Sequence, residues 1–500
     1  MKNQVQLTTY VDRLTGGGLR DLFDLLNGPM QGMFGGVHML PFFYPIDGAD
    51  AGFDPIDHTM VDERLGDWDD VAKLAQTHDV MADIIVNHMS AQSRQFQDVL
   101  AKGKQSPFAS LFLRMNSVFS EGVTEKDLLT IYRPRPGLPY SVIPLADGEK
   151  GLFWTTFTSN QIDIDVLHPQ GEAYLESILA RFHQAGVTII RLDAAGYAIK
   201  KAGTSCFMIP ETYEFIAKFT AKAQALGMKV LVEIHSYFRE QIEIAKRVDY
   251  VYDFALPPLV LHALFTQTAQ YLKKWLAISP RNAITVLDTH DGIGIIDIGP
   301  SGERPGLVPD ADIDLIVETI HERSRGQSRK ATGAAASNLD LYQVNCTYYD
   351  ALGRDDHQYL LARLIQFFAP GVPQVYYTGA LAEPNDMSLL NETNVGRDIN
   401  RHHFAFGEAA AALERTVVKH LANLMRFRNQ HPAFMGEFIV ADAPSHQLQV
   451  RWQNEAEFAD LVLDFEQLSF VLSFSQLGET HRIENDWAQL GERFFASSQG

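Results

Sequence analysis

The feature of this sequence that most limits its possible folds is the recurrence of short, β-branched apolar runs that end in polar or charged residues. Several runs are followed by amphipathic stretches of helix length, a pattern typical of repeated βα units. Eight runs predict strands: Val5–Tyr10, Gly36–Phe43, Val80–Asn87, Val187–Asp193, Lys229–His235, Tyr250–Phe254, Ala283–Asp288 and Val372–Tyr377. Eight strands close a parallel barrel, so the order favours an α/β fold of the (β/α)₈ type over an open sheet.

Amphipathic periodicity predicts the helices that alternate with these strands. The predicted helices are Trp68–Thr77, Glu172–Gln184, Glu211–Leu226, Phe238–Val248 and Gln358–Phe368.

Two gaps in the βα pattern are far longer than ordinary βα loops and predict inserted subdomains. They span residues 89–167 (subdomain B) and 292–353 (subdomain B′), which leaves barrel segments at 1–88, 168–291 and 354–433. Both insertions would stand over the face where βα loops emerge. From residue 434 to 500 the apolar residues alternate with polar ones, as in Leu448, Val450 and Trp452, which predicts a C-terminal antiparallel β domain.

The charge balance excludes some classes of partner. A formal net charge of −20 repels nucleic-acid phosphates and anionic lipid headgroups, so neither nucleic acid nor a membrane is an expected partner. The N-terminus lacks a signal-like apolar run, and the longest apolar stretch, 255–265, is too short to span a bilayer. Two cysteines, Cys206 and Cys346, suit a reducing compartment, so we expect a cytoplasmic protein.

Charged residues gather at the carboxyl ends of the predicted strands, where a barrel builds its active site. Alternation places Arg191 and Asp193 on one face of their strand, so Arg191 is expected to keep Asp193 ionised. The same alternation aligns Glu233 with Leu231, an apolar setting of the kind that raises a carboxyl pKa. His290 and Asp291 follow another strand.

Three carboxylates in different environments suit glycosidic-bond chemistry, in which one attacks or stabilises and another protonates the leaving oxygen. A single strand-end Asp is more often a helix cap, but Asn87-His88 adds a fourth polar strand end and favours a site. Asn87, His88, His235 and His290 could instead bind a metal. No HExxH or His-x-His motif occurs, and sugar hydroxyls use imidazoles equally well, so no metal is predicted.

Aromatic and cationic residues near the predicted mouth suggest ligand contacts. Phe53, Phe157 and Tyr197 could stack on a sugar ring, although an aromatic side chain is more often core packing. Arg135 lies between two prolines that fix its backbone, which suggests an anionic substrate in a chain of this charge. A solvated loop arginine is the alternative.

Several motifs resemble the sucrose phosphorylases of the α-amylase superfamily. The superfamily's four characteristic regions are matched by DIIVNH (83–88), RLDA (191–194), EIHS (233–236) and VLDTHDG (286–292). The narrower likeness lies in IYRPRPG (131–137), AASNLDLYQ (335–343), VPQVYY (372–377) and VGRDINR (395–401). It extends to about residue 430 and fades in the C-terminal β domain.

The resemblance implies reversible phosphorolysis of sucrose, with sucrose, phosphate, glucose 1-phosphate and fructose as small-molecule partners, no cofactor, and a homodimer. Asp193 is then similar to the nucleophile, Glu233 to the acid/base, and Asp291 to the transition-state stabiliser. The residues resembling the glucosyl and substrate contacts are Asp50, Phe53, His88, Phe157, Gln161, Arg191, Tyr197, His235, His290 and Arg397. Those resembling the acceptor and phosphate contacts are Tyr132, Arg135, Leu339, Asp340, Tyr342 and Gln343, with His235 shared.

Three alternatives remain open from the sequence. One is a related phosphorylase, such as one acting on sucrose 6′-phosphate, whose acceptor loop is expected to differ from IYRPRPG and LDLYQ. Another is an α-glucosidase or transglucosidase on the same barrel. The third is a non-enzymatic carbohydrate-binding or scaffold protein, which would be expected to lack at least one of the three carboxylates.

Overall fold

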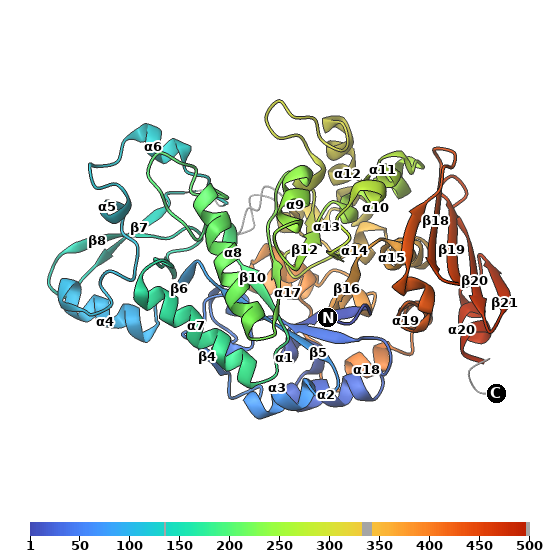
Figure 1. Ribbon diagram of the computed structural model, residues 1–500, viewed down its shortest axis with the longest axis horizontal. Helices are drawn as coiled ribbons and strands as arrows, with labels where there is room; N and C mark the ends of the chain where they lie inside the picture. The colour runs from blue at the N-terminus through green and yellow to red at the C-terminus, as the bar shows by residue number, and fades with distance from the viewer. Residues whose placement is uncertain (135–136, 333–342, 497–500) are drawn as a thin grey trace.

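A computed structural model describes residues 1–134, 137–332 and 343–496 of the chain (Figure 1). Within them a closed barrel of parallel strands has the order β1-β16-β13-β12-β11-β10-β5-β2. Its strands are β1 (Gln6–Thr9), β2 (Gly36–Met39), β5 (Asp79–Ile85), β10 (Ile189–Asp193), β11 (Lys229–Val232), β12 (Tyr250–Asp253), β13 (Ala283–Thr285) and β16 (Val372–Tyr376). Each coincides with a predicted strand, so the predicted (β/α)₈ barrel is confirmed.

The barrel has two apolar cores. Inward-facing side chains fill its interior as a separate cluster of Met81, Ile189, Leu231, Tyr252, Phe254, Ile284 and Val286. Outward-facing residues of the same strands pack against the surrounding helices in a much larger cluster. Ile189 and Leu231 lie in the inner cluster, so Arg191, Asp193 and Glu233, which continue the same alternation, point toward the mouth of the barrel.

Helices follow the strands and cover the barrel (Figure 1). They are α1 (Val11–Thr15), α2 (Leu19–Asn27), α3 (Trp68–Leu74), α7 (Pro169–Gln184), α8 (Pro210–Ala225), α9 (Phe238–Ala245), α10 (Leu256–Thr266), α11 (Gln270–Ile278) and α15 (Asp356–Phe368). Local signals explain where some begin: α7 and α8 carry proline in the first turn, and the Asp355 side chain accepts from the Gln358 N–H to cap α15. The predicted helices are confirmed, and α3 ends three residues before the predicted Thr77.

The connection after β2 forms a small lobe at the mouth of the barrel. It contains β3 (Phe43–Tyr44), the 3₁₀ turn η1 (Ala49–Gly52), and β4 (Asp57–Val61), which pairs antiparallel with β3. Asp50 lies in η1 with a left-handed backbone at φ 55°.

The long connection after β5 forms the lobe at the left of Figure 1. Its elements are β6 (His88–Ser90), α4 (Arg94–Lys102), η2 (Gly103–Gln105), α5 (Met115–Val118), α6 (Glu125–Thr130), β7 (Tyr140–Pro144), β8 (Lys150–Trp154) and β9 (Gln161–Asp163). β9 returns to pair antiparallel with β6, with His88 opposite Asp163 and Ser90 opposite Gln161. This pairing brings the end of the connection back to the barrel mouth.

A second long connection follows β13. Its described elements are β14 (Ile293–Gly294), η4 (Ile296–Ile298), α12 (Asp310–Arg323), α13 (Gln327–Thr332), β15 (Gln343–Val344) and α14 (Tyr348–Ala351). β14 pairs antiparallel with β15, so the two ends of this segment meet beside the mouth.

The chain after β16 leads into a separate sheet. The connecting elements are α16 (Tyr377–Ala380), α17 (Met387–Thr393), η5 (Gly396–Asn400), α18 (Glu408–Ala412), α19 (Thr416–Gln430) and η6 (Pro432–Met435). The sheet contains β17 (Glu437–Val440), β18 (Gln447–Asn454), β19 (Glu457–Asp464), β20 (Ser469–Gln476) and β21 (Glu479–Glu484), all antiparallel, followed by α20 (Trp487–Ala496).

The C-terminal antiparallel sheet is confirmed, with Leu448, Val450 and Trp452 of β18 buried as their alternation predicts. The exact domain boundaries stay a prediction. No helix in the part of the chain that the structure describes is both long and apolar enough to cross a membrane.

Candidate active site

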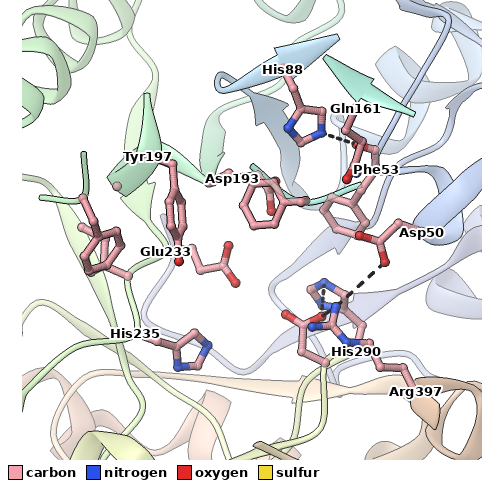
Figure 2. A pocket seen from close by; sticks show the side chains of 16 residues that line it. Asp50, Phe53, His88, Gln161, Asp193, Tyr197, Glu233, His235, His290 and Arg397 are labelled. Carbon is pink, nitrogen blue, oxygen red and sulfur yellow. Dashed lines mark hydrogen bonds and ion pairs between the residues drawn. The ribbon is translucent and has the colours of Figure 1, made fainter. Parts of the chain in front are cut away.

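A pocket with an empty volume of about 710 Å³ lies at the carboxyl ends of the barrel strands (Figure 2). The predicted residues that line it are Asp50, Phe53, His88, Phe157, Gln161, Asp193, Tyr197, Glu233, His235, His290, Asp291 and Arg397. The structure therefore brings together residues from 50 to 397 that no single sequence motif connects.

Arg191 lies beneath this pocket and holds its two central carboxylates. One guanidinium nitrogen lies 2.9 Å from Asp193 Oδ1, and the other lies 2.7 Å from Glu233 Oε1. The first nitrogen also donates to Asp83 Oδ1 at 2.5 Å, because Arg191 and Asp83 are register partners on β10 and β5. Burial opposes ionisation of Asp83, but Arg191 and His38 outweigh it and lower its pKa to about 2. Arg191 is thus a fixed, buried cation shared by three acids.

The ionisation of Asp193 differs from the expectation drawn from its strand. Burial and the neighbouring Glu233 raise the pKa of Asp193 well above its usual range, and Arg191 offsets them only in part. The expected apolar setting of Glu233 is wrong as well, because its carboxylate contacts Arg191. Two carboxyl groups held on one guanidinium in different environments can divide the roles of nucleophile and acid.

Asp291 occupies the opposite wall with Arg397. Arg397 Nη1 donates to Asp291 Oδ1 at 2.5 Å and lies 4.0 Å from Asp50 Oδ1. Burial alone would raise the pKa of Asp291. The neighbouring Arg397 and His290 outweigh burial and hold that pKa well below its usual range. Burial lowers the pKa of His290 to about 3, so this imidazole is neutral near pH 7. The wall presents an ionised carboxylate, a guanidinium and a neutral imidazole to a ligand's hydroxyl groups.

Asp288, which ends the predicted strand just before His290 and Asp291, does not line the pocket. Its two oxygens accept from Arg363 Nη2 at 2.9 Å each, and both side chains are fully buried. Asp288 therefore joins β13 to α15 outside the pocket, and Asp291 is the acid of this segment that faces a ligand.

Aromatic rings line the pocket between these groups. Phe53 stacks on His290 with centroids 5.0 Å apart, and Phe157 meets Tyr197 edge-on at 5.1 Å. Tyr132 stacks on Phe207 at 4.6 Å, which extends the aromatic surface out of the pocket. Flat apolar faces beside polar walls are suited to a pyranose ring.

The predicted acceptor residues divide into two groups. Gln343 contacts His235 with 3.3 Å between their Nε2 atoms, and Tyr132 continues the ring surface from Tyr197 through Phe207. These residues adjoin the Glu233 side of the pocket. Arg135, Leu339, Asp340 and Tyr342 lie outside the described residues, and their roles stay predictions.

Three residues at the site were missed by sequence reasoning. Phe207 follows β10 by 14 positions, and no local pattern marks it. Asp297 contacts His235 from η4, inside the second long connection. Lys200 donates to Asn87 Oδ1 at 2.8 Å and to the Tyr197 carbonyl, and it pairs with Asp163 Oδ2 at 2.9 Å. Each acts through a contact distant in sequence, which residue spacing along one element cannot reveal.

The buried side chain of Lys200 connects the lobe after β5 with the loop that carries Tyr197. Because Lys200→Met leaves Asp163 buried without its cation, we expect a loss of about 3–5 kcal/mol in the free energy of unfolding. Urea or thermal unfolding of Lys200→Met measures this loss of stability. The control is Lys201→Met, whose exposed pair with Glu211 should matter little to the unfolding midpoint. Equal unfolding midpoints for the two variants would contradict the stabilising role of the pair between Lys200 and Asp163.

Within the described residues no group of three or more His, Cys, Asp or Glu side chains is arranged to hold a metal ion. The acids of the pocket instead contact guanidinium groups of the protein.

Comparison with known proteins identifies the family of this chain. Residues 32–274 match the family model described as "Alpha amylase, catalytic domain". The chain is 64% identical over 468 residues to a sucrose phosphorylase of Agrobacterium vitis, covering 93% of this chain and 96% of the relative. It is 54% identical over 467 residues to that of Bifidobacterium adolescentis, covering 93% and 92%. The chain belongs to the sucrose phosphorylase family.

A solved structure of a family relative has the same fold. The sucrose 6F-phosphate phosphorylase from Thermoanaerobacter thermosaccharolyticum superposes with a TM-score of 0.88 at 37% identity, covering 97% of this chain and 98% of that one. The predicted family resemblance is confirmed, and the pocket lies on the face where barrels of this class carry catalysis.

Proposed function

We propose that this enzyme catalyses the reversible phosphorolysis of sucrose to α-D-glucose 1-phosphate and D-fructose. The observation that carries the proposal is the shared guanidinium of Arg191, which holds Asp193 and Glu233 together in a pocket whose other wall presents Asp291. The two phosphorylases at 64% and 54% identity support it.

The glucosyl unit is proposed to lie against the wall of Asp50, His290 and Arg397, with Phe53 beside its ring (Figure 2). Asp50 and Asp291 accept from sugar hydroxyls, and Arg397 and the neutral imidazoles of His88 and His290 complete the contacts. Gln161 and Phe157, which come from the lobe after β5, also line the pocket.

The reaction then runs as two displacements at the glucosyl C1. An Asp193 oxygen attacks C1 while the bond from C1 to the fructosyl oxygen breaks, and Glu233 gives its proton to that oxygen. A phosphate oxygen next attacks C1, the ester bond to Asp193 breaks, and Glu233 takes the phosphate proton. Asp291 stabilises the positive charge that develops in both transition states. Two inversions give net retention.

Fructose and phosphate are proposed to occupy the same side of the pocket in turn. Tyr197, His235 and Glu233 face this space across from Asp50 and Arg397 (Figure 2). Tyr132 and Gln343 adjoin it, and Arg135 remains the predicted cation for phosphate, outside the described residues.

The test is incubation of the purified enzyme with sucrose and phosphate, with glucose 1-phosphate, fructose and free glucose quantified. We expect glucose 1-phosphate and fructose in equal amounts, and a much larger kcat/KM for sucrose than for sucrose 6′-phosphate. A preference for sucrose 6′-phosphate would assign the enzyme to that related activity. Free glucose in place of glucose 1-phosphate would instead indicate an α-glucosidase.

We further propose a cytoplasmic homodimer. The compartment is supported by Cys206 and Cys346, which are buried free thiols, and the assembly rests on the family resemblance alone. Size-exclusion chromatography with light scattering tests the oligomeric state, and a monomer mass would contradict it.

A further inference from the structure

The three histidines that line the described part of the pocket have different electrostatic settings. Burial lowers the pKa of His88 and that of His290, so both rings are neutral near pH 7. Burial also opposes the charged form of His235, but Asp297, with smaller contributions from Glu233 and Asp291, outweighs it and raises the pKa of His235. His235 is therefore the pocket histidine most readily charged.

The difference originates in Asp297. His235 Nδ1 lies 3.2 Å from Asp297 Oδ2, and the Asp297 side chain is fully buried. Asp297 Oδ1 accepts from the Ser236 N–H at 3.2 Å and from Gln241 Nε2 at 2.8 Å. Among the described residues the ion-pair partner of Asp297 is His235, and the two form an ion pair when the ring is protonated.

The ring of His235 is also fixed in direction. It stacks on Phe254 with centroids 3.8 Å apart and planes 15° apart. Gly294 faces the pair so closely that a Cβ there would lie 3.2 Å from Asp297 Oδ2 and 3.6 Å from His235 Cε1. Nδ1 contacts Asp297, and Nε2 contacts Gln343.

Gln343 contacts the second ring nitrogen of His235. Its Nε2 lies 3.3 Å from His235 Nε2, while its Oε1 is buried without a hydrogen-bond partner. As placed, the amide N–H donates to Nε2 of the ring, and an amide turned by half a turn would instead present Oε1 to a protonated nitrogen.

The position of this charge matters for the second substrate. Arg397, the guanidinium lining the opposite wall, is already paired with Asp291. His235 lies on the Glu233 side, where the leaving fructose makes room for phosphate (Figure 2). A phosphate dianion entering there meets the carboxylates of Glu233 and Asp193, so a nearby cation is needed to offset their repulsion.

We propose that Asp297 is a positioning residue for the phosphate step: it fixes the ring of His235 and supplies the buried counter-charge that allows His235 to meet phosphate as an imidazolium. This inference rests on the proposed function. Phosphate takes the place of Gln343 at Nε2 and accepts from the Nε2–H of the charged ring, and fructose, being neutral, depends less on the charge.

Asp297→Asn tests the proposal, because the amide keeps the shape of Asp297 and removes its charge. We expect the KM for phosphate near neutral pH to rise about tenfold, the scale of one charge-assisted hydrogen bond, with a smaller change in kcat for sucrose hydrolysis without phosphate. A histidine with a raised pKa is charged below that pKa and loses its charge as pH rises through it. The alkaline fall in kcat/KM for phosphate should therefore move to lower pH in the variant.

The matched control is Asp312→Asn, which removes the carboxylate 2.9 Å from His262 in a similar pair outside the pocket. It should leave the phosphate KM and the pH profile unchanged. The alkaline limb is compared between proteins at each pH, because titration of phosphate itself affects all of them equally. An unchanged phosphate KM and an unchanged alkaline limb in Asp297→Asn would overturn the proposal.

A measurement on the unmodified enzyme covers the case in which Asp297→Asn does not fold. NMR of ¹⁵N-histidine-labelled protein reports the charge of each ring, and loss of one signal set in His235→Gln assigns His235. A His235 pKa above the ordinary value of about 6.5 supports the proposal, and one below it overturns it. Failure of the proposed function is distinguishable, because the unmodified enzyme would then form no glucose 1-phosphate at all.

Discussion

Replacement of Asp193 by asparagine is expected to reduce sucrose turnover by about 10⁴-fold or more, the scale for losing a catalytic nucleophile. The amide has nearly the shape of the carboxylate and can keep a contact with Arg191, so the pocket should stay intact. It lacks the anionic oxygen that forms the ester with C1, and both half-reactions pass through that ester. Steady-state kinetics with sucrose and phosphate measures the loss.

The control for Asp193→Asn is Glu172→Gln, which removes one negative charge from the exposed surface of α7 and should leave turnover unchanged. Mass spectrometry of the variant excludes reversion by deamidation. Activity above a few per cent in deamidation-free Asp193→Asn would remove Asp193 from the role of nucleophile.

Glu233→Gln should give the second largest loss, and the size of the loss should depend on the leaving group. Fructose needs a proton as its bond to C1 breaks, so kcat/KM for sucrose should fall by about 10²–10⁴-fold, the usual contribution of general acid catalysis. Fluoride leaves with little help from an acid. Release of fluoride from α-glucosyl fluoride should therefore slow far less.

Glu240→Gln is the matched control, since Glu240 lies seven residues further along the same segment in an exposed pair with Arg304. Its kinetics with both donors should equal those of the unmodified enzyme. Equal losses on sucrose and α-glucosyl fluoride in Glu233→Gln would mean that Glu233 does not act as the general acid.

The barrel was predictable because its strands carry local signals. Each strand is a short β-branched run, and the alternation that places Ile189 inside the barrel also directs Arg191 and Asp193 to its mouth. Val187 does not follow this alternation. The predicted run begins at Val187 but β10 begins at Ile189, so Val187 precedes the strand and packs in the outer core. The pocket residues followed from strand ends and from the family resemblance.

The electrostatics of the site could not be read in the same way. Whether Arg191 reaches Glu233 depends on how β10 and β11 are aligned, and alternation along one strand does not contain that information. Asp288 and Asp291 look equivalent in sequence, yet one pairs with Arg363 on α15 and the other faces the pocket. Asp297 and Lys200 likewise act through partners that the tertiary fold supplies.

These contacts also explain why Arg191 is central to the proposed chemistry. Two neighbouring buried carboxylates repel each other when both are ionised, and a guanidinium between them reduces that repulsion. Arg191, itself shared with Asp83, contacts both acids and so holds the proposed nucleophile and the proposed acid beside each other.

The central claim is that a glucosyl group is carried on Asp193 and transferred from there to phosphate. Isotope exchange between labelled phosphate and glucose 1-phosphate, with fructose absent, tests it most directly, because a covalent intermediate forms from glucose 1-phosphate alone. We predict that the label enters glucose 1-phosphate with retention of the α anomer, and that Asp193→Asn abolishes the exchange. Exchange that requires fructose would contradict the account, since it would mean that both substrates must be bound before the bond at C1 breaks.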